Sequence, residues 1–244
     1  MNIVEALDAD SEMVCVVGAG GKKTTLYTLA NLVPQSVLTA TVRIPIFDEH
    51  VARVDVTADP VAALRDTDAW PLGLVPEQER DDRYRGYDPS LVTAIQESGE
   101  ATAVFVKADG ARTRWLKAPN DREPRIPPTA DTVIPIVSAR VVGKPLSEEY
   151  VHRPERVAAI TGLNVGDTIH TDDVAAVLAS RAGGLKSVPP QATVIPLVNM
   201  VDDDELETVG RDIAAGILER ADVPRVVLAR MNTEKPLVTV VERD

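Results

Sequence analysis

The chain has 244 residues, 44% of them apolar, and its formal net charge at pH 7 is −12. That charge argues against a nucleic-acid partner, because a phosphate backbone needs a basic face. No segment reaches the ~18 uninterrupted apolar residues of a membrane span, and the acidic first residues lack the basic and apolar regions of an export signal. The single cysteine, Cys15, fits a reducing compartment. We therefore expect a cytoplasmic protein that binds neither nucleic acid nor membrane, with its oligomeric state left open.

The charged residues are also unevenly distributed among the residue types. The chain has 7 lysines against 19 arginines, and 22 aspartates against 16 glutamates. An acidic, lysine-poor surface keeps a protein hydrated in concentrated salt, where charge repulsion is screened within ~3 Å at 1 M. We predict a halophilic protein, the alternative being an ordinary acidic one. Thermal unfolding at increasing KCl should show stability rising into the molar range, and a protein that is most stable in dilute buffer would contradict the hypothesis.

Short β-branched segments alternate with helical ones along most of the chain. The predicted strands lie at residues 13–17, 36–42, 102–108, 132–138, 192–199, 224–230 and 237–241. The predicted helices lie at residues 24–32, 91–98, 171–184 and 202–221. Most strands are apolar throughout, which is typical of a parallel sheet covered on both faces. The pattern predicts a P-loop NTPase-like α/β fold, with three layers around a mainly parallel sheet, in a single domain over residues 1–244.

Two regions interrupt this alternation. Residues 66–90 and 110–128 are rich in proline, glycine and charge, and they contain both tryptophans. Long irregular segments in a compact domain are commonly functional loops or mobile linkers, and composition alone does not choose between the two. We assign both segments as irregular functional loops.

Residues 13–30, MVCVVGAGGKKTTLYTLA, join the first strand to the first helix through a glycine-rich turn. Backbone N–H groups in such a turn form an anion-binding nest, and the following helix N-terminus adds positive potential. We therefore predict a nucleotide site, for ATP or GTP, in this turn. Its residues are Gly18, Ala19, Gly20, Gly21, Lys22, Lys23, Thr24 and Thr25.

The P-loop pattern G-x-x-x-x-G-K-[ST] fits the turn imperfectly in either of two registers. If Lys23 is the phosphate-binding lysine, Thr24 follows it correctly, but Lys22 stands where glycine belongs. If Lys22 has that role, Gly21 is in place, but Lys23 replaces the hydroxyl. We favour Lys23, with Lys22 as a second charge near the loop.

Two other interpretations of the turn are weaker. A dinucleotide-binding turn needs G-x-G-x-x-G, but Lys23 occupies the third glycine position, and the second strand ends in Thr and Arg rather than an acid. A plain strand–turn–helix connection leaves two adjacent lysines unexplained in a lysine-poor chain. The phosphate-binding interpretation therefore stands first.

A P-loop enzyme also needs a carboxylate at the end of a neighbouring strand, where it supports Mg²⁺ through the metal's water shell. Asp109 follows the predicted strand 102–108 and precedes a glycine, although an Asp-Gly turn is common for structural reasons alone. We expect Mg²⁺ to be ligated by Thr24 and supported by Asp109, and we assign catalytic roles to Lys23 and Asp109.

The segment NMVD places Asn199 and Asp202 directly beyond a buried strand. Their spacing is that of the N-K-x-D tetrad with which many nucleotide-binding proteins read guanine, with Met200 in place of the lysine. The alternative is a polar cap on the helix that follows. We predict that Asn199 and Asp202 contact the base, with the choice between ATP and GTP left open.

Basic residues gather in the loop that follows Asp109. They are Arg112, Arg114, Lys117, Arg122 and Arg125. In an acidic protein such a cluster is a candidate site for the phosphate of a substrate or of a pterin, the alternative being a loop laced with surface ion pairs. The predicted substrate residues are Arg112, Lys117, Arg122, Glu123, His152 and Arg153.

Along most of its length the sequence resembles the YqeC family, described as accessory proteins for selenium-dependent molybdenum hydroxylases. That family shows a GAGGKT-like loop, a threonine-rich second strand, E-A-D-G-A, L-K-A-P, H-E-P-x-I-P, V-H-R-P-E and an N-K-x-D-like stretch. The corresponding segments here are GAGGKKTT (18–25), LTATVRI (38–44), KADGAR (107–112), LKAPNDREPRIP (116–127), VHRPE (151–155) and NMVD (199–202).

The resemblance implies nucleotide binding and assistance in maturing a molybdenum hydroxylase or its cofactor, through Mg-dependent binding or hydrolysis of ATP or GTP. A non-hydrolysing nucleotide-gated adaptor and a small-molecule kinase are the alternatives. The chain departs from the family pattern in the extra lysine of the loop, in Lys107 where the family has an acid, and in Arg122 where it has histidine. Without that acid the chain lacks a group that could serve as a second metal ligand or base in hydrolysis.

Overall fold

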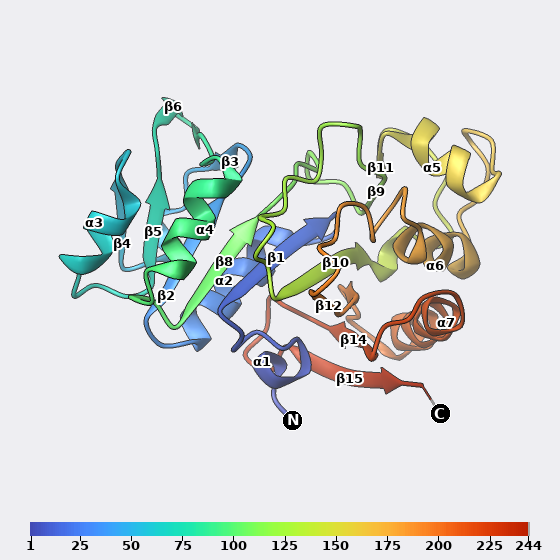
Figure 1. Cartoon of the computed structure of the whole chain (residues 1–244). Coiled ribbons are helices and arrows are strands. Elements are labelled where there is room, and N and C mark those ends of the chain that lie inside the picture. The colour runs from blue at the N-terminus through green and yellow to red at the C-terminus, as the bar shows by residue number, and fades with distance from the viewer. Residues whose placement is uncertain (244) are drawn as a thin grey trace.

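The computed structural model describes residues 1–243 and shows a three-layer α/β fold around one large sheet (Figure 1). In order across this sheet, the strands are β15 (Leu237–Glu242), β14 (Arg225–Ala229), β13 (Leu197–Asn199), β10 (Thr132–Ser138), β1 (Met13–Gly18), β8 (Ala103–Lys107), β2 (Ser36–Ala40), β5 (Leu72–Val75) and β4 (Arg53–Val56), with β12 (Thr193–Val194) beside β10. Within the described residues, β15 pairs antiparallel with β14 and the other pairs of this sheet are parallel. The predicted fold class is thereby confirmed.

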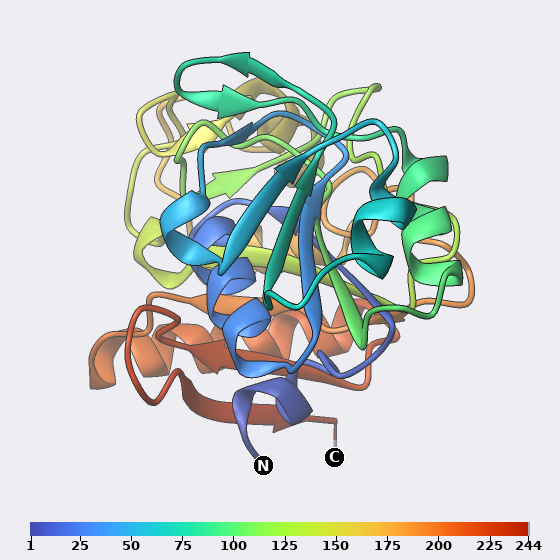
Figure 2. The same cartoon turned by 90° about the vertical axis from the view of Figure 1, so that its left-hand side faces the viewer.

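Helices cover both faces of the sheet (Figure 2). They are α1 (Ile3–Ala6), α2 (Lys22–Leu32), α3 (Pro60–Arg65), α4 (Pro89–Glu97), α5 (Pro154–Thr161), α6 (Thr171–Ala179) and α7 (Asp204–Arg220), with 3-10 turns at Asp48–His50 and Ala139–Val141. Side chains alternate along a strand, so Val14 and Val16 pack in the core with α1 and α2, whereas Cys15 and Val17 pack with α3 and α4. The cluster over β10, β13 and β14 is completed by α5, α6 and α7.

The predicted strands all occur, with the segment 192–199 divided into β12 and β13. The four predicted helices occur as α2, α4, α6 and α7, and α7 begins at an Asp203 cap whose carboxylate accepts from the Leu206 N–H at 2.8 Å. The helices α1, α3 and α5 and the strands β4 and β5 were not predicted, because they are short and interrupted by proline, glycine or charge.

The prediction of an irregular loop over 66–90 was wrong. This segment contains β5, which pairs with both β2 and β4 in the main sheet. It also contains β6 (Gln78–Arg80) and β7 (Arg83–Tyr84), which form a small antiparallel sheet with β3 (Ile44–Pro45). Residues 110–128 are mostly irregular, as expected, apart from β9 (Leu116–Lys117), which pairs with β11 (Val151–His152).

The parallel strands bring several polar residues to one edge of the main sheet. The glycine turn follows β1, Asp109 follows its neighbour β8, and Ser138 and Asn199 end β10 and β13. In open α/β sheets, ligands bind beyond the carboxyl ends of the strands. Among residues 1–243, none of the helices combines the length and the apolar character that crossing a bilayer requires.

Candidate functional site

The turn after β1 is packed so closely that its glycines are required. Gly18 has φ +92°, and a Cβ there would lie 2.3 Å from the Ile136 carbonyl oxygen of β10. Gly20 has φ +107°, and a Cβ there would lie 2.3 Å from the Ser138 nitrogen. Both the left-handed backbone and the close neighbours exclude larger residues. The sequence therefore places the glycine turn directly against the end of β10.

The first lysine of the pair folds back over this turn. Lys22 is 5% exposed, and its ammonium lies 2.9 Å from an Asp109 oxygen and donates to the Gly18 carbonyl. Lys23 is half-buried and faces a cavity, and within the described residues it makes no ion pair. Lys22 is thus the lysine committed to the turn, whereas Lys23 presents its charge to the space beyond it.

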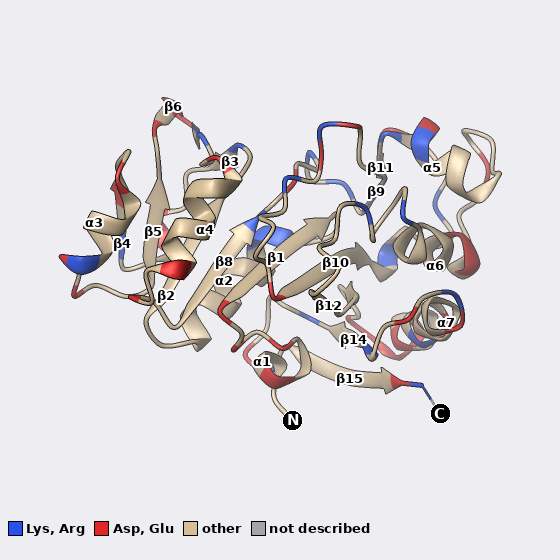
Figure 3. Cartoon of the chain, viewed as in Figure 1, with Lys and Arg blue, Asp and Glu red and all other residues tan. Residues whose placement is uncertain are grey.

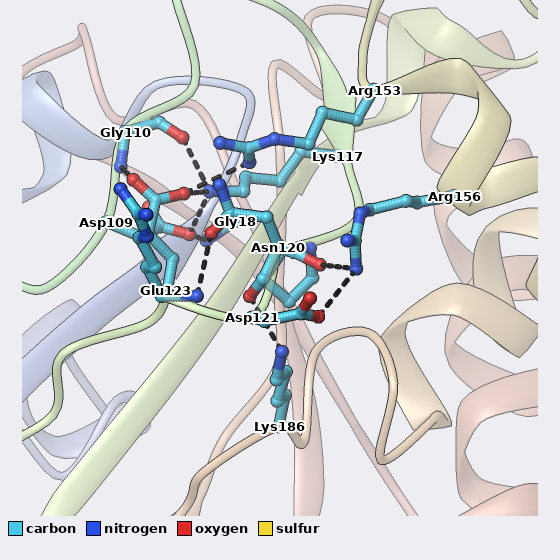
Figure 4. A network of polar contacts seen from close by, with 12 residues as sticks. Gly18, Asp109, Gly110, Lys117, Asn120, Asp121, Glu123, Arg153, Arg156 and Lys186 are labelled. Atoms are coloured by element: carbon cyan, nitrogen blue, oxygen red, sulfur yellow. Dashed lines mark hydrogen bonds and ion pairs between the residues drawn. The ribbon is translucent and has the colours of Figure 1, made fainter.

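Asp109 lies at the centre of a buried ionic network (Figure 4). Besides Lys22, its carboxylate accepts from the Lys117 ammonium and from the Gly18 N–H, both at 2.9 Å. Lys117 also contacts Glu123 at 3.0 Å and donates to the Gly110 carbonyl at 2.5 Å. Arg153, from the start of α5, donates to Glu123 at 3.0 Å. The network thereby joins β1, β8, the loop 110–128 and α5.

The network contains more positive than negative groups. Burial raises the pKa of the Asp109 carboxyl, but the charges of Lys22 and Lys117 outweigh it and hold that pKa below its usual value. Nearby, Lys107 is 6% exposed and donates to the Arg43 carbonyl at 2.6 Å. Burial, together with the charge of Lys22, lowers the pKa of Lys107 to about 7. Two carboxylates, Asp109 and Glu123, are therefore paired with three cations, Lys22, Lys117 and Arg153, and the network carries a net positive charge even without Lys107.

A cavity of about 580 Å³ opens above this network. Among the described residues its walls have one carboxylate, Glu123, and eight basic side chains. The basic residues are Lys22, Lys23, Arg43, Arg83, Lys107, Arg112, Arg114 and Arg153. Figure 3 shows lysine and arginine gathered on the loops around the carboxyl ends of β1 and β8. A concentration of positive charge in so acidic a protein indicates an anionic ligand.

One aromatic side chain contributes to the wall. Trp115 is half-buried against Tyr150, with ring centroids 5.3 Å apart, and lines the cavity. His152 also lines it, and burial, with the charge of Arg153 as the second cause, lowers the pKa of His152 to about 4. The imidazole is therefore neutral at pH 7. The cavity thus has an apolar surface beside its basic one.

The structure brings together only part of the predicted site. Gly20, Gly21 and Thr24 line the cavity, whereas the Thr25 hydroxyl donates to the Gly21 carbonyl at 3.1 Å inside the helix. Ala19 is buried, and its N–H donates to the Ile136 carbonyl. The nucleotide roles of these residues stay predictions, and the geometry leaves Thr24 as the hydroxyl facing the cavity.

The two residues proposed to read a base have other contacts. Asn199 is 3% exposed, its amide donates to the Gly20 carbonyl at 2.8 Å, and its oxygen accepts from the Met231 N–H at 3.1 Å. Asp202 pairs with Arg140 at 2.6 Å. Base recognition by these two residues stays a prediction. In this structure Asn199 stabilises the glycine turn through its hydrogen bond to the Gly20 carbonyl.

The basic loop divides into three groups. Arg112 and Arg114 line the cavity, and Lys117 is buried in the network beneath it. Arg122 is exposed and is not among the residues that line the cavity, and Arg125 pairs with Asp88 at 2.9 Å. The substrate-binding role predicted for Arg122 is thus the one that this geometry supports least.

The carboxylate predicted to support Mg²⁺ is paired with cations of the protein itself, whereas the predicted ligand Thr24 lines the cavity. Mg²⁺ binds through oxygen ligands, usually one or two carboxylates besides water and phosphate. Asp109 is ion-paired with Lys22 and Lys117 and accepts from the Gly18 N–H, and Glu123 is ion-paired with Lys117 and Arg153. Among residues 1–243, no group of three or more His, Cys, Asp or Glu side chains could hold a metal ion.

Sequence reasoning missed three of the basic residues that line the cavity. Arg43 follows β2, Arg83 lies on β7, and Lys107 ends β8. Lys107 was noticed solely as a departure from a family pattern. No local motif marks the two arginines, because the pairing of β3 with β7 brings Arg83 to the cavity.

Comparison with known proteins agrees with the arrangement of these motifs. A family model described as "YqeC protein" matches residues 14–155, which include the glycine turn, the basic loop and most of the ionic network. The "Uncharacterized protein YqeC" of Escherichia coli (strain K12) is 29% identical over 193 residues, covering 77% of this chain and 75% of that protein. The chain therefore belongs to the YqeC family.

Proposed function

We propose that this protein binds a nucleoside triphosphate, ATP or GTP, in the cavity above the glycine turn. The observation that supports this most directly is the wall itself, with eight basic side chains and one carboxylate in a chain of net charge −12. A volume of about 580 Å³ also lies within the range of about 300–1,000 Å³ that is usual for small-molecule sites.

In this proposal the phosphates lie against the glycine turn and the start of α2. The Gly21 cap offers no side chain to the first N–H groups of this helix, so they remain free to bind an anion. Lys23, at the start of α2, and Arg112, in the loop that follows Asp109, both line the cavity and supply charge to the phosphates. The base stacks on Trp115, since stacking on an indole suits either purine.

The role of the bound nucleotide follows from family resemblance alone. We propose that its binding or hydrolysis assists the maturation of a selenium-dependent molybdenum hydroxylase or its cofactor. The Mg²⁺ expected from the sequence contributes no step, because each Asp109 oxygen lies 2.9 Å from a buried ammonium group, Oδ1 from Lys22 and Oδ2 from Lys117. Sustained turnover of nucleotide would identify an enzyme, and tight binding without turnover would identify an adaptor.

A thermal-shift panel of nucleotides in KCl tests the proposal. A ligand at a hundredfold its dissociation constant adds ~2.7 kcal/mol to the free energy of unfolding, which raises the melting temperature by roughly 5–10 °C for a chain of this size. Lys23→Gln and Arg112→Gln should each weaken binding about tenfold or more, through loss of a charge-assisted hydrogen bond.

Arg122→Gln is the matched control, because it removes an exposed arginine of the same loop that does not line the cavity. Its dissociation constant should stay within about twofold of the unmodified protein's, as expected for a charge screened by solvent. Equal losses in Arg112→Gln and Arg122→Gln, or a panel in which no nucleotide raises the melting temperature, would contradict the proposal.

A further inference from the structure

The carboxylates near the cavity are all paired with cations of the protein itself. Asp109 is 2% exposed and receives two ammonium groups and one N–H. Glu123, the carboxylate that lines the cavity among the described residues, receives Lys117 and Arg153, both at 3.0 Å. A divalent cation entering here would have to displace a protein cation from either Asp109 oxygen or from Glu123 Oε2, since Glu123 Oε1 alone receives an uncharged donor, the Gly110 N–H at 3.3 Å. It would also approach through a wall of like charge.

At two positions the chain has a lysine where a metal-dependent site would have an oxygen ligand. Lys23 directly follows Lys22, at the position that the G-K-[ST] pattern gives to the metal-binding hydroxyl. Lys107 is buried at the carboxyl end of β8, and within residues 1–243 its ammonium has a single acceptor, the Arg43 carbonyl, and no ion pair. A protonated lysine has three N–H donors, and an anion beside Lys107 favours that form, so Lys107 can donate to an anion in the cavity it lines.

We propose that the cavity binds its polyphosphate as the metal-free anion, with Lys23 and Lys107 supplying the positive charge that Mg²⁺ supplies in other nucleotide sites. This inference rests on the nucleotide binding proposed above. Bound Mg²⁺ would remove two charges from the ligand and would weaken its attraction to the surplus of cations. The site therefore discriminates between free and magnesium-bound nucleotide.

Metal-free binding also bears on the chemistry. In P-loop enzymes the metal bridges the β- and γ-phosphate oxygens and neutralises the charge that develops during transfer. A cavity selective for the free anion holds the nucleotide without that bridge, so occupancy rather than hydrolysis becomes the signal. The inference thus favours the nucleotide-gated adaptor over the NTPase.

The test is titration calorimetry of the full chain with ATP and with GTP, in excess EDTA and in excess MgCl₂. The expected result is binding in EDTA that weakens about tenfold when magnesium saturates the nucleotide, because two of its negative charges are neutralised. Binding in magnesium but not in EDTA would overturn the metal-free inference and leave the nucleotide proposal standing. No binding in either medium would overturn both.

Variants sharpen this test. Lys23→Thr restores the hydroxyl of the pattern at a half-buried position that makes no ion pair among the described residues, so it should fold. It should lose about tenfold in affinity in EDTA, through loss of one ammonium, and less in magnesium.

The double variant Lys23→Thr, Lys107→Glu also has an acid at the end of β8, and its nucleotide binding should depend on the metal. Arg122→Gln should keep the metal response of the unmodified protein, and an unchanged preference for EDTA in Lys23→Thr would contradict the inference.

Discussion

Replacing Asp109 by asparagine is expected to destabilise the protein by about 3–5 kcal/mol, since it removes the shared partner of two buried charges. Lys22 and Lys117 are 5% and 4% exposed, and both contact this carboxylate at 2.9 Å. Asparagine keeps the shape but cannot neutralise either ammonium. For a chain of this size the melting temperature should fall by roughly 6–20 °C, measured by calorimetry or circular dichroism.

Asp88→Asn provides the matched control for this measurement. Asp88 also pairs with a cation, Arg125 at 2.9 Å, but its side chain is 62% exposed. Its loss should change the free energy of unfolding by less than about 1 kcal/mol, because exposed ion pairs contribute little. If Asp109→Asn were no more harmful than Asp88→Asn, the buried network could not be what holds the turn, the loop and α5 together.

Replacing Lys107 by methionine is expected to change how stability depends on pH. The pKa of Lys107 is lowered from 10.5 to about 7 in the folded protein, mainly by burial. Between these values the unfolded chain binds more protons than the folded one, so the free energy of unfolding rises with pH. The contribution of this one group is up to about 1.4 kcal/mol per pH unit. Denaturant unfolding of the unmodified protein at pH 7, 8 and 9 should show this rise, roughly 2–3 kcal/mol in all.

In Lys107→Met the rise should be smaller by that amount, because the group that releases a proton on folding is gone. Burial also lowers the pKa of Lys22, but Lys22 is present in both proteins, so comparing the two slopes subtracts its contribution. Lys235→Met, which removes an exposed lysine, should leave the slope as it was. If the free energy of unfolding rose equally with pH in Lys107→Met and in the unmodified protein, Lys107 would keep its proton on folding, and the prediction would be contradicted.

The strongly apolar strands could be predicted from the sequence, and the weaker ones could not. β1, β8 and β10 are almost entirely apolar, and each is bounded by glycine or polar residues. β4 reads RVDV and β5 reads LGLV, too short and too mixed to show a period. β5 is held in place by its pairing with β2 and β4, which depends on residues distant in the chain.

The parts of the site that are continuous in sequence could be predicted, whereas the contacts that depend on the register between strands could not. The glycine turn and the basic loop are continuous in sequence, and both reach the cavity. The pairing of Lys22 with Asp109 follows from the β1–β8 register, in which Val16 lies opposite Lys107. No sequence pattern shows that β8 rather than β2 is the neighbour of β1. For the same reason the sequence could not predict that Asp109 is ion-paired with two lysines.

A crystal structure of the complex with a non-hydrolysable ATP or GTP analogue tests the central claim most directly. It should show the phosphates within hydrogen-bond distance of the first N–H groups of α2 and of the Lys23 ammonium, with the purine against Trp115. A nucleotide bound elsewhere, with Lys23 extended into solvent, would contradict the account.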